Sequence, residues 1–245
     1  MFETNPTADW IIAQGINFEA GVACKLKCPG CARTFNPSVL KGGRVYRFDN
    51  YKPILDVGYE FVFCGNRSDP IYHPDFLYTI EYLNNNNKCL EVATNGSGMT
   101  EEWWIKAFSL TNKHTNKGRK TRRIGTEWIF GLDGKPEDSH KYRVNQDGVH
   151  VWEMMKLGKS MGCEITWQYI VFNYNENHID YCMQMAESYG INFDLIHSSR
   201  WWPLTKHLKP SEKYIAERRA YSNGMFDINL SDIDPKTKRL KEWKK

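Results

Sequence analysis

The chain has 245 residues, of which 41% are hydrophobic and 25% charged, and its formal net charge is +4 at pH 7. This composition excludes a disordered or collagen-like chain, and no apolar run is long enough to predict a membrane span. The first residues lack the basic start and apolar core of a secretory signal, so we expect a cytoplasmic protein with few disulfides. Its seven cysteines, an odd number, therefore need another explanation.

Six short apolar segments alternate with helix-like segments along the chain. They cover residues 16–19, 60–64, 90–93, 127–130, 164–172 and 191–196. Their starts are about 27 to 44 residues apart, which is the spacing of βα units in a parallel sheet. Because βαβ crossovers are right-handed, we expect a single α/β domain, a partial (βα)6 parallel barrel over residues 1–200. Residues 201–245 are expected to form a C-terminal extension, with a helix that starts after Ser211 and a basic tail.

Local signals predict where some of the helices begin and end. Thr100 is expected to cap the helix that begins at Glu101, and Gly190 to end the helix before the sixth strand. Two runs, 113–123 and 236–245, each contain six Lys or Arg residues. We interpret them as a solvated loop and a basic tail, with nucleic-acid binding as the alternative.

A cluster of three cysteines directly follows the first expected strand. Cys24, Cys28 and Cys31 have the spacing Cys-x3-Cys-x2-Cys. A structural zinc site takes four protein ligands, whereas a [4Fe–4S] cluster takes one cysteine per iron, so three cysteines leave one iron with an open position. The remaining cysteines stand singly and are expected to pack as small buried hydrophobic side chains; they are Cys64, Cys89, Cys163 and Cys182.

The cysteine spacing resembles the signature of the radical S-adenosylmethionine (radical SAM) superfamily. Segment 67–76, Arg-Ser-Asp-Pro-Ile-Tyr-His-Pro-Asp-Phe, follows the second strand and is similar to the family's Gly-Gly-Glu-Pro-x-x-His-Pro segment. In the family that segment holds the methionyl amino group of SAM. Asp69 stands in the place of the acid, and Arg67 and Ser68 replace the two glycines.

Two further segments resemble the family in the expected order. Asn95, in Ala-Thr-Asn-Gly after the third strand, matches the family's Thr-Asn-Gly. Phe-Gly-Leu-Asp-Gly at 130–134 is similar to the Ser-Leu-Asp-Gly segment of the peptide-modifying and sulfatase-maturing branch. In that branch an arginine twelve residues after the serine binds the SAM carboxylate, and Arg143 is twelve residues after Gly131.

The sequence also departs from the family at two positions. Gly30 precedes the third cysteine, where the family often has an aromatic residue near the adenine. Gly131 replaces the serine that contacts the ribose, and Asp133 or Asn95 could compensate. Further candidates for ribose or adenine contacts lie at the fifth and sixth strands: Gln168, Asn173 and Leu195.

The resemblance implies a [4Fe–4S] cluster and SAM as cofactors, which carry the hard chemistry while the protein positions them. One electron from a donor such as flavodoxin or ferredoxin would cleave SAM to methionine and a 5′-deoxyadenosyl radical, and the radical would take hydrogen from the substrate. Asp69 would accept from the SAM ammonium and Arg143 would pair with its carboxylate. No catalytic residue is assigned beyond the cluster. Trp201 and Trp202 could wall the substrate pocket or anchor the C-terminal segment.

Three functions compete at this stage. The leading one is modification of a peptide or protein side chain, because the 132–143 segment resembles that branch, although no cysteine follows Cys182 to hold an auxiliary cluster. The second is modification of a nucleotide, an RNA base or another small molecule. The third is a zinc-binding, nucleic-acid-binding module in which a histidine such as His73 completes the ligand set.

Overall fold

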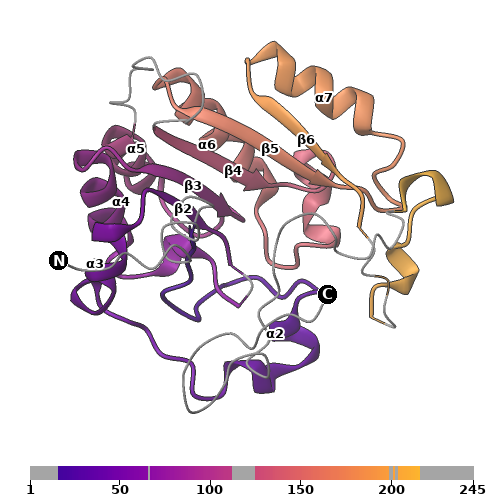
Figure 1. The fold of residues 1–245 in the computed structure, drawn as a ribbon. Coiled ribbons are helices and arrows are strands. Elements are labelled where there is room, and N and C mark those ends of the chain that lie inside the picture. Colours follow the sequence, from indigo (N-terminus) through magenta and orange to yellow (C-terminus); the bar gives the residue numbers. More distant parts are fainter. Residues whose placement is uncertain (1–15, 66, 112–124, 199–200, 202–203, 216–245) are drawn as a thin grey trace, which may run out of the picture. The chain divides into compact units, whose positions relative to one another are not determined.

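The computed structural model describes residues 16–65, 67–111, 125–198, 201 and 204–215 (Figure 1). Both basic runs, 113–123 and 236–245, lie outside the described residues, as does Trp202. In the part of the chain that is described, no helix is both long enough and apolar enough to cross a bilayer.

Six parallel strands form one sheet, in the order β1-β2-β3-β4-β5-β6. They are β1 (Ile16–Asn17), β2 (Glu60–Phe63), β3 (Cys89–Thr94), β4 (Gly125–Gly131), β5 (Glu164–Ile170) and β6 (Asn192–Ile196). Each predicted strand is therefore confirmed, with ends that differ by a few residues. Because the spatial order follows the chain order, successive crossovers wind in one direction and give the partial α/β barrel that the sequence predicts.

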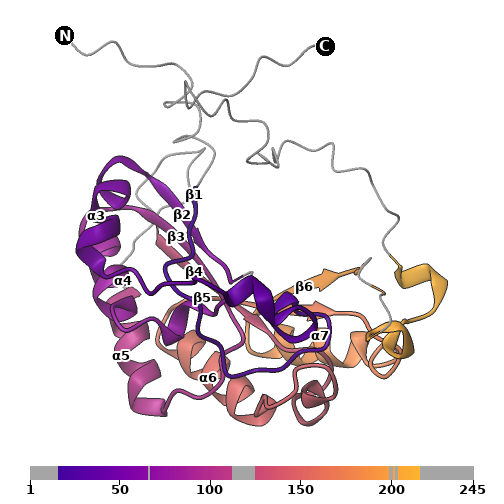
Figure 2. The ribbon, with the colours of Figure 1, turned by 90° about the horizontal axis from the view of Figure 1, so that it is seen from below.

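Apart from α2, the α-helices connect successive strands and follow the outer side of the curved sheet (Figure 2). The α-helices are α2 (Ala32–Phe35), α3 (Phe48–Val57), α4 (Phe76–Asn85), α5 (Glu101–Thr111), α6 (Gly148–Ser160) and α7 (Ile179–Ser188). Short 3-10 turns are η1 (Pro37–Leu40), η2 (Pro70–Tyr72), η3 (Pro136–Lys141), η4 (Lys206–Leu208) and η5 (Glu212–Tyr214).

The predicted helix ends of α5 and α7 are confirmed by their capping geometry. The Thr100 hydroxyl accepts a hydrogen bond from the backbone N–H of Trp103 at 3.3 Å, which satisfies one of the free donors at the start of α5. Gly190 has a φ of 65° just after α7, the left-handed conformation that ends many helices.

Aromatic side chains fill the space between the sheet and the helices. Trp104 of α5 is fully buried and packs against Trp128 of β4 at 5.6 Å and Phe130 at 5.2 Å between ring centroids. The indole N–H of Trp128 donates to the Thr111 hydroxyl at 3.1 Å, so its polar group is satisfied inside the core. This packing holds the helices against the sheet. Polar side chains lie instead at the carboxyl ends of the strands, such as Asp69 and Asn95.

Two sequence predictions need correction. Cys89, Cys163 and Cys182 are buried as expected, but Cys64 is half-buried, because β2 ends at Phe63 and places it at the carboxyl edge of the sheet. The helix expected after Ser211 is only the 3-10 turn η5 in the described residues. The Ser211 side chain makes no capping bond, and the turn ends in extended backbone at Ile215. The Ser211 N–H instead donates to the Glu176 carboxylate at 2.7 Å.

Candidate active site at the carboxyl edge of the sheet

A cavity of about 580 Å³ lies at the carboxyl ends of the central strands. Most of the residues predicted for the site line it: Cys24, Cys28, Gly30, Cys31, Ser68, Asp69, Asn95, Gly131, Arg143 and Gln168. Its volume is that of a small-molecule site, and open α/β sheets bind ligands at this edge. Residues as far apart in the sequence as Cys24 and Gln168, 144 positions, are thus brought to one cavity by the winding of the sheet.

The cysteine loop is held from several sides. The backbone N–H of Asp69 donates to the Ala23 carbonyl at 2.8 Å, and that of Lys27 donates to the Val144 carbonyl at 3.0 Å. The Arg33 guanidinium reaches back to the loop and donates to the Val22 carbonyl and, at 3.4 Å, to the Cys24 carbonyl. These contacts fix the loop backbone without using the sulfur atoms, so the three thiols remain directed to the cavity.

At Cys24 and Cys28 the electrostatics favour the thiol over the thiolate when no metal is bound. Burial raises the pKa of Cys24, and it raises the pKa of Cys28 to about 12, although Arg33 beside Cys24 and Arg143 beside Cys28 act in the opposite direction. Cys31 lies close enough for its charge to raise both values further. A positively charged metal centre removes this mutual repulsion, so binding would release protons from the loop.

Three cysteines match the ligand number of a [4Fe–4S] cluster that keeps one iron open. Among the described residues no three Cys, His, Asp or Glu side chains are placed to hold one metal ion. A [4Fe–4S] cluster does not need that arrangement, because each cysteine binds a different iron. His73, the candidate fourth zinc ligand, uses both ring nitrogens: Nε2 contacts the Tyr46 carbonyl at 2.8 Å, and Nδ1 accepts from the Asp75 N–H at 3.1 Å. The hypothesis of a zinc site completed by His73 is therefore not supported.

Asp69 is a buried carboxylate that links the loop after β2 to the end of β3 by hydrogen bonds. It accepts hydrogen bonds from the Thr94 hydroxyl at 2.8 Å, the Asn95 N–H at 2.6 Å, the Asn95 side-chain amide and the Ile71 N–H. Burial raises the pKa of Asp69 to about 6 against the lowering effect of these donors, so it is ionised at neutral pH. The same Asn95 amide points at the Cys24 sulfur at 3.5 Å, and it links the carboxylate to the cysteine loop.

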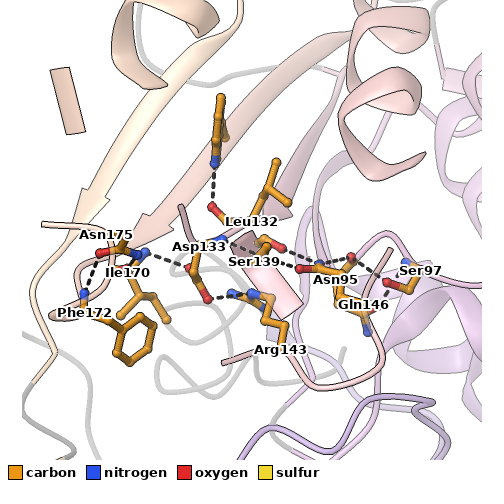
Figure 3. A network of polar contacts seen from close by, with 12 residues as sticks. Asn95, Ser97, Leu132, Asp133, Ser139, Arg143, Gln146, Ile170, Phe172 and Asn175 are labelled. Carbon is orange, nitrogen blue, oxygen red and sulfur yellow. Dashed lines mark hydrogen bonds and ion pairs between the residues drawn. The ribbon is translucent and has the colours of Figure 1, made fainter. Parts of the chain in front are cut away.

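Asp133 and Arg143 form a buried ion pair beside the cavity (Figure 3). The Arg143 Nε lies 2.7 Å from Asp133 Oδ2, and the Ile170 N–H donates to Oδ1 at 2.8 Å. Asp133 is fully buried, and burial raises its pKa while Arg143 opposes that rise. Asp133 does not line the cavity, so the structure places it behind Arg143, where it orients the guanidinium.

Gly131 leaves the space that the Arg143 guanidinium occupies. A Cβ atom at residue 131 would lie 2.4 to 2.7 Å from three atoms of the Arg143 guanidinium. The absence of a side chain at Gly131 is thus explained by the arginine that packs over it, and not by a ligand contact of its own.

Two buried polar residues complete this network and were missed in the sequence. The Gln146 amide donates to the Asn95 carbonyl at 2.7 Å and to the Gly131 carbonyl at 2.9 Å (Figure 3). The Ser139 hydroxyl donates to Gln146 and accepts from the Asp133 N–H at 2.9 Å. No local sequence pattern identifies these two residues, because their role depends on how β3 and β4 lie side by side. The one available signal is position: Ser139 lies within the 132–143 segment, and Gln146 follows it by three residues.

Glu19 and Arg33 also act in the site and were not predicted. Glu19 Oε1 accepts from the backbone N–H groups of Arg67 and Ser68, at 2.6 and 2.7 Å, and from the Ser68 hydroxyl at 2.9 Å. Ser68 therefore contributes to the cavity wall through a hydroxyl that Glu19 already holds. The available signals were positional: Glu19 follows the first strand, and Arg33 follows the third cysteine by two residues.

Besides Asp133, the predicted residues Asn173 and Leu195 lie outside the cavity lining. The Asn173 side chain donates to the His207 carbonyl at 2.7 Å, which anchors the turn η4. Leu195 is partly buried on β6 and packs against the hydrophobic core. Trp201 lies edge-on to Phe172 at 5.9 Å, and its indole N–H donates to the Ser198 carbonyl at 2.8 Å, which is an anchoring contact.

Comparisons with known proteins agree on the fold. No protein-family model matches the sequence, and the search of curated proteins gives no match. Among solved structures, SuiB of Streptococcus suis bound to S-adenosylmethionine matches with a TM-score of 0.58 and 11% identity over 73% of this chain and 39% of SuiB. SuiB bound to its precursor peptide SuiA matches with a TM-score of 0.57 and 12% identity over 79% of this chain and 40% of SuiB.

A second enzyme gives the same result. The structure of anSMEcpe with bound AdoMet and the Cp18Cys peptide matches with a TM-score of 0.51 and 16% identity, over 75% of this chain and 50% of anSMEcpe. This chain therefore has the fold of radical SAM enzymes, the class that the cysteine spacing resembles. It spans half or less of the length of these enzymes.

Proposed function

We propose that this protein is a radical SAM enzyme in which Cys24, Cys28 and Cys31 hold a [4Fe–4S] cluster and SAM binds beside it. The observation that carries the proposal is the convergence of these cysteines with a buried carboxylate, Asp69, and a partly buried arginine, Arg143, on one cavity. The fold is the second support, since it is shared with enzymes whose structures hold SAM.

The protein's own residues are suited to an α-amino acid group in the cavity. When bound, the cluster and SAM supply reductive cleavage of SAM and hydrogen abstraction. Asp69 is ionised and attracts an ammonium group, and Arg143 offers its remaining N–H groups to a carboxylate while Asp133 holds its Nε. The two opposite charges line one cavity, and Asp69 is 6% exposed and the Arg143 side chain 13%, so contacts with them are stronger than contacts with fully exposed charges.

We propose a peptide or protein side chain as the substrate. SuiB and anSMEcpe were each solved with a peptide, and the 132–143 segment resembles the peptide-modifying branch. A set of deuterated candidate peptides tests this, because transfer of deuterium into 5′-deoxyadenosine identifies the residue that loses hydrogen.

The cofactor proposal is tested by anaerobic reconstitution with iron and sulfide, followed by dithionite and SAM. We expect about four irons per chain and formation of 5′-deoxyadenosine. Cys28→Ala should lose both, whereas Cys163→Ala, at a buried cysteine between α5 and β5, should keep both. Zinc that persists after reconstitution, without any cleavage product, contradicts the proposal.

Replacing Asp69 with alanine should weaken SAM binding by about ten- to a hundredfold while iron content stays at the wild-type level. The removed carboxylate is the acidic side chain that lines the cavity, and a charge-assisted hydrogen bond contributes about 1.5–3 kcal/mol. Equilibrium dialysis with labelled SAM measures the change. Asp56→Ala, which removes a surface carboxylate paired with Lys52, is the matched control. Unchanged SAM affinity in Asp69→Ala would show that the 67–76 segment does not hold the amino group.

A further inference from the structure

The Tyr142 side chain stands directly over the cysteine loop. It follows η3, lines the cavity, and its hydroxyl would lie only 2.7 Å from a Cβ atom at Gly30. Thr205 Cγ2 would lie 3.2 Å from that Cβ, and the Tyr142 ring atom Cε2 would lie 3.6 Å from it. Gly30 does not have a positive φ, so its backbone would accept another residue. The Tyr142 ring thus fills the space that a side chain between Cys28 and Cys31 would otherwise use.

This ring is fixed by its neighbours. Its centroid lies 4.3 Å from that of Phe172, which is 2% exposed and in turn stacks on Tyr174 at 5.6 Å. The Tyr174 hydroxyl donates to the Asp133 carbonyl at 2.9 Å. The three aromatic rings are therefore linked through Asp133 to the ion pair that orients Arg143. Tyr142 directly precedes that arginine in the sequence.

The Tyr142 ring differs in chemistry from the charged side chains of the cavity, because it offers a flat apolar face. Among the described residues, the charged side chains that line the cavity are Arg33, Asp69 and Arg143. The Arg33 guanidinium binds backbone carbonyls of the cysteine loop, and Asp133 holds the Arg143 Nε, so neither is placed as a free face for a planar base. In the part of the chain that is described, two aromatic side chains line the cavity: Phe35 is 46% exposed, whereas Tyr142 is packed against Phe172. An aromatic face stacks on a nucleobase with about 1–3 kcal/mol of free energy.

We propose that Tyr142 supplies the aromatic face against which the adenine of SAM packs, from the segment after β4, where residue 30 provides no side chain. The proposal rests on the proposed function, because it assigns a residue to the same cofactor. Arg143 and Tyr142 would then hold the two ends of one ligand from adjacent positions.

The test is fragment binding to the reconstituted protein, with SAM, 5′-methylthioadenosine and methionine as probes. Tyr142→Leu should weaken binding of SAM and of 5′-methylthioadenosine by about fivefold to a hundredfold, the range that loss of one stacked ring predicts. Methionine, which has no adenine, should bind as in the wild type. Tyr142→Phe keeps the ring and should keep the wild-type affinity for all three probes. A general disturbance of the loop would weaken methionine as well and would overturn the assignment.

A relocation of the ring gives an independent check. Gly30→Phe alone should lose SAM affinity, since its Cβ would collide with Tyr142. Combining Gly30→Phe with Tyr142→Ala removes the 2.7 Å collision and leaves the 3.2 Å contact with Thr205 Cγ2, which requires only a small shift of that methyl group. The double variant should bind SAM more tightly than Tyr142→Ala alone. A wild-type protein that holds iron but binds no SAM overturns the proposed function and the role of Tyr142 together. SAM binding that is equal in the wild type and Tyr142→Leu overturns the role of Tyr142 alone.

Discussion

Replacing Asp133 with leucine is expected to lower the free energy of unfolding by about 3–5 kcal/mol. Asp133 is fully buried, and its loss leaves the Arg143 guanidinium, whose side chain is 13% exposed, without its anion. The Ile170 N–H loses its acceptor in the same step, which adds to the penalty. Urea denaturation followed by circular dichroism measures the change.

Two further variants separate the ion pair from general damage. Asp133→Leu combined with Arg143→Met replaces both charges by apolar groups and should recover part of the lost stability, but not the affinity for SAM. Asp138→Ala removes a carboxylate of the same segment that pairs with the more exposed Lys141, and should cost less than about 1 kcal/mol. A loss for Asp133→Leu no larger than that for Asp138→Ala would contradict a structural role for the pair.

Replacing Gly131 with serine should reduce SAM affinity by at least about tenfold, since it displaces a charge-assisted contact. The new Cβ would lie within 2.7 Å of the guanidinium, and Asp133 holds that group so that it cannot swing away without breaking the ion pair. Equilibrium dialysis with labelled SAM measures the affinity. Gly21→Ala, where the nearest atom to the new Cβ is 3.4 Å away, is a control that should bind SAM normally.

The effect of Gly131 is expected to pass through Arg143. In that case Gly131→Ser adds nothing to Arg143→Ala, and the double variant should have the SAM affinity of Arg143→Ala. Additive losses in the double variant would show instead that the open backbone at Gly131 contacts the ligand itself.

Local sequence patterns predicted the barrel well. Each strand is a short apolar segment at βα spacing, and that periodicity depends on burial on both faces of a parallel sheet. The cap at Thr100 and the glycine at 190 were also predictable, because helix capping depends on a few neighbouring residues. The cap predicted at Ser211 is not formed, because its side chain makes no capping bond and its N–H donates to Glu176, which is remote in sequence. Beyond Ile215 the expected helix lies outside the described residues.

The candidate site was predictable only in part. Motifs located Cys24, Asp69 and Arg143, whose side chains line one cavity in the structure. The partners that fix them were not visible, because Gln146 bridges the ends of β3 and β4, and Tyr142 approaches Gly30 from more than a hundred residues away. Such roles follow from the register of neighbouring strands and have no local signal.

The central claim is that the three-cysteine loop holds a cluster to which SAM binds directly. Electron paramagnetic resonance of the reconstituted, dithionite-reduced protein, recorded with and without SAM, tests it most directly. We predict a reduced [4Fe–4S] signal whose shape changes when SAM is added and which is absent in Cys28→Ala. A cluster signal that is identical with and without SAM, or one that survives in Cys28→Ala, would contradict the claim.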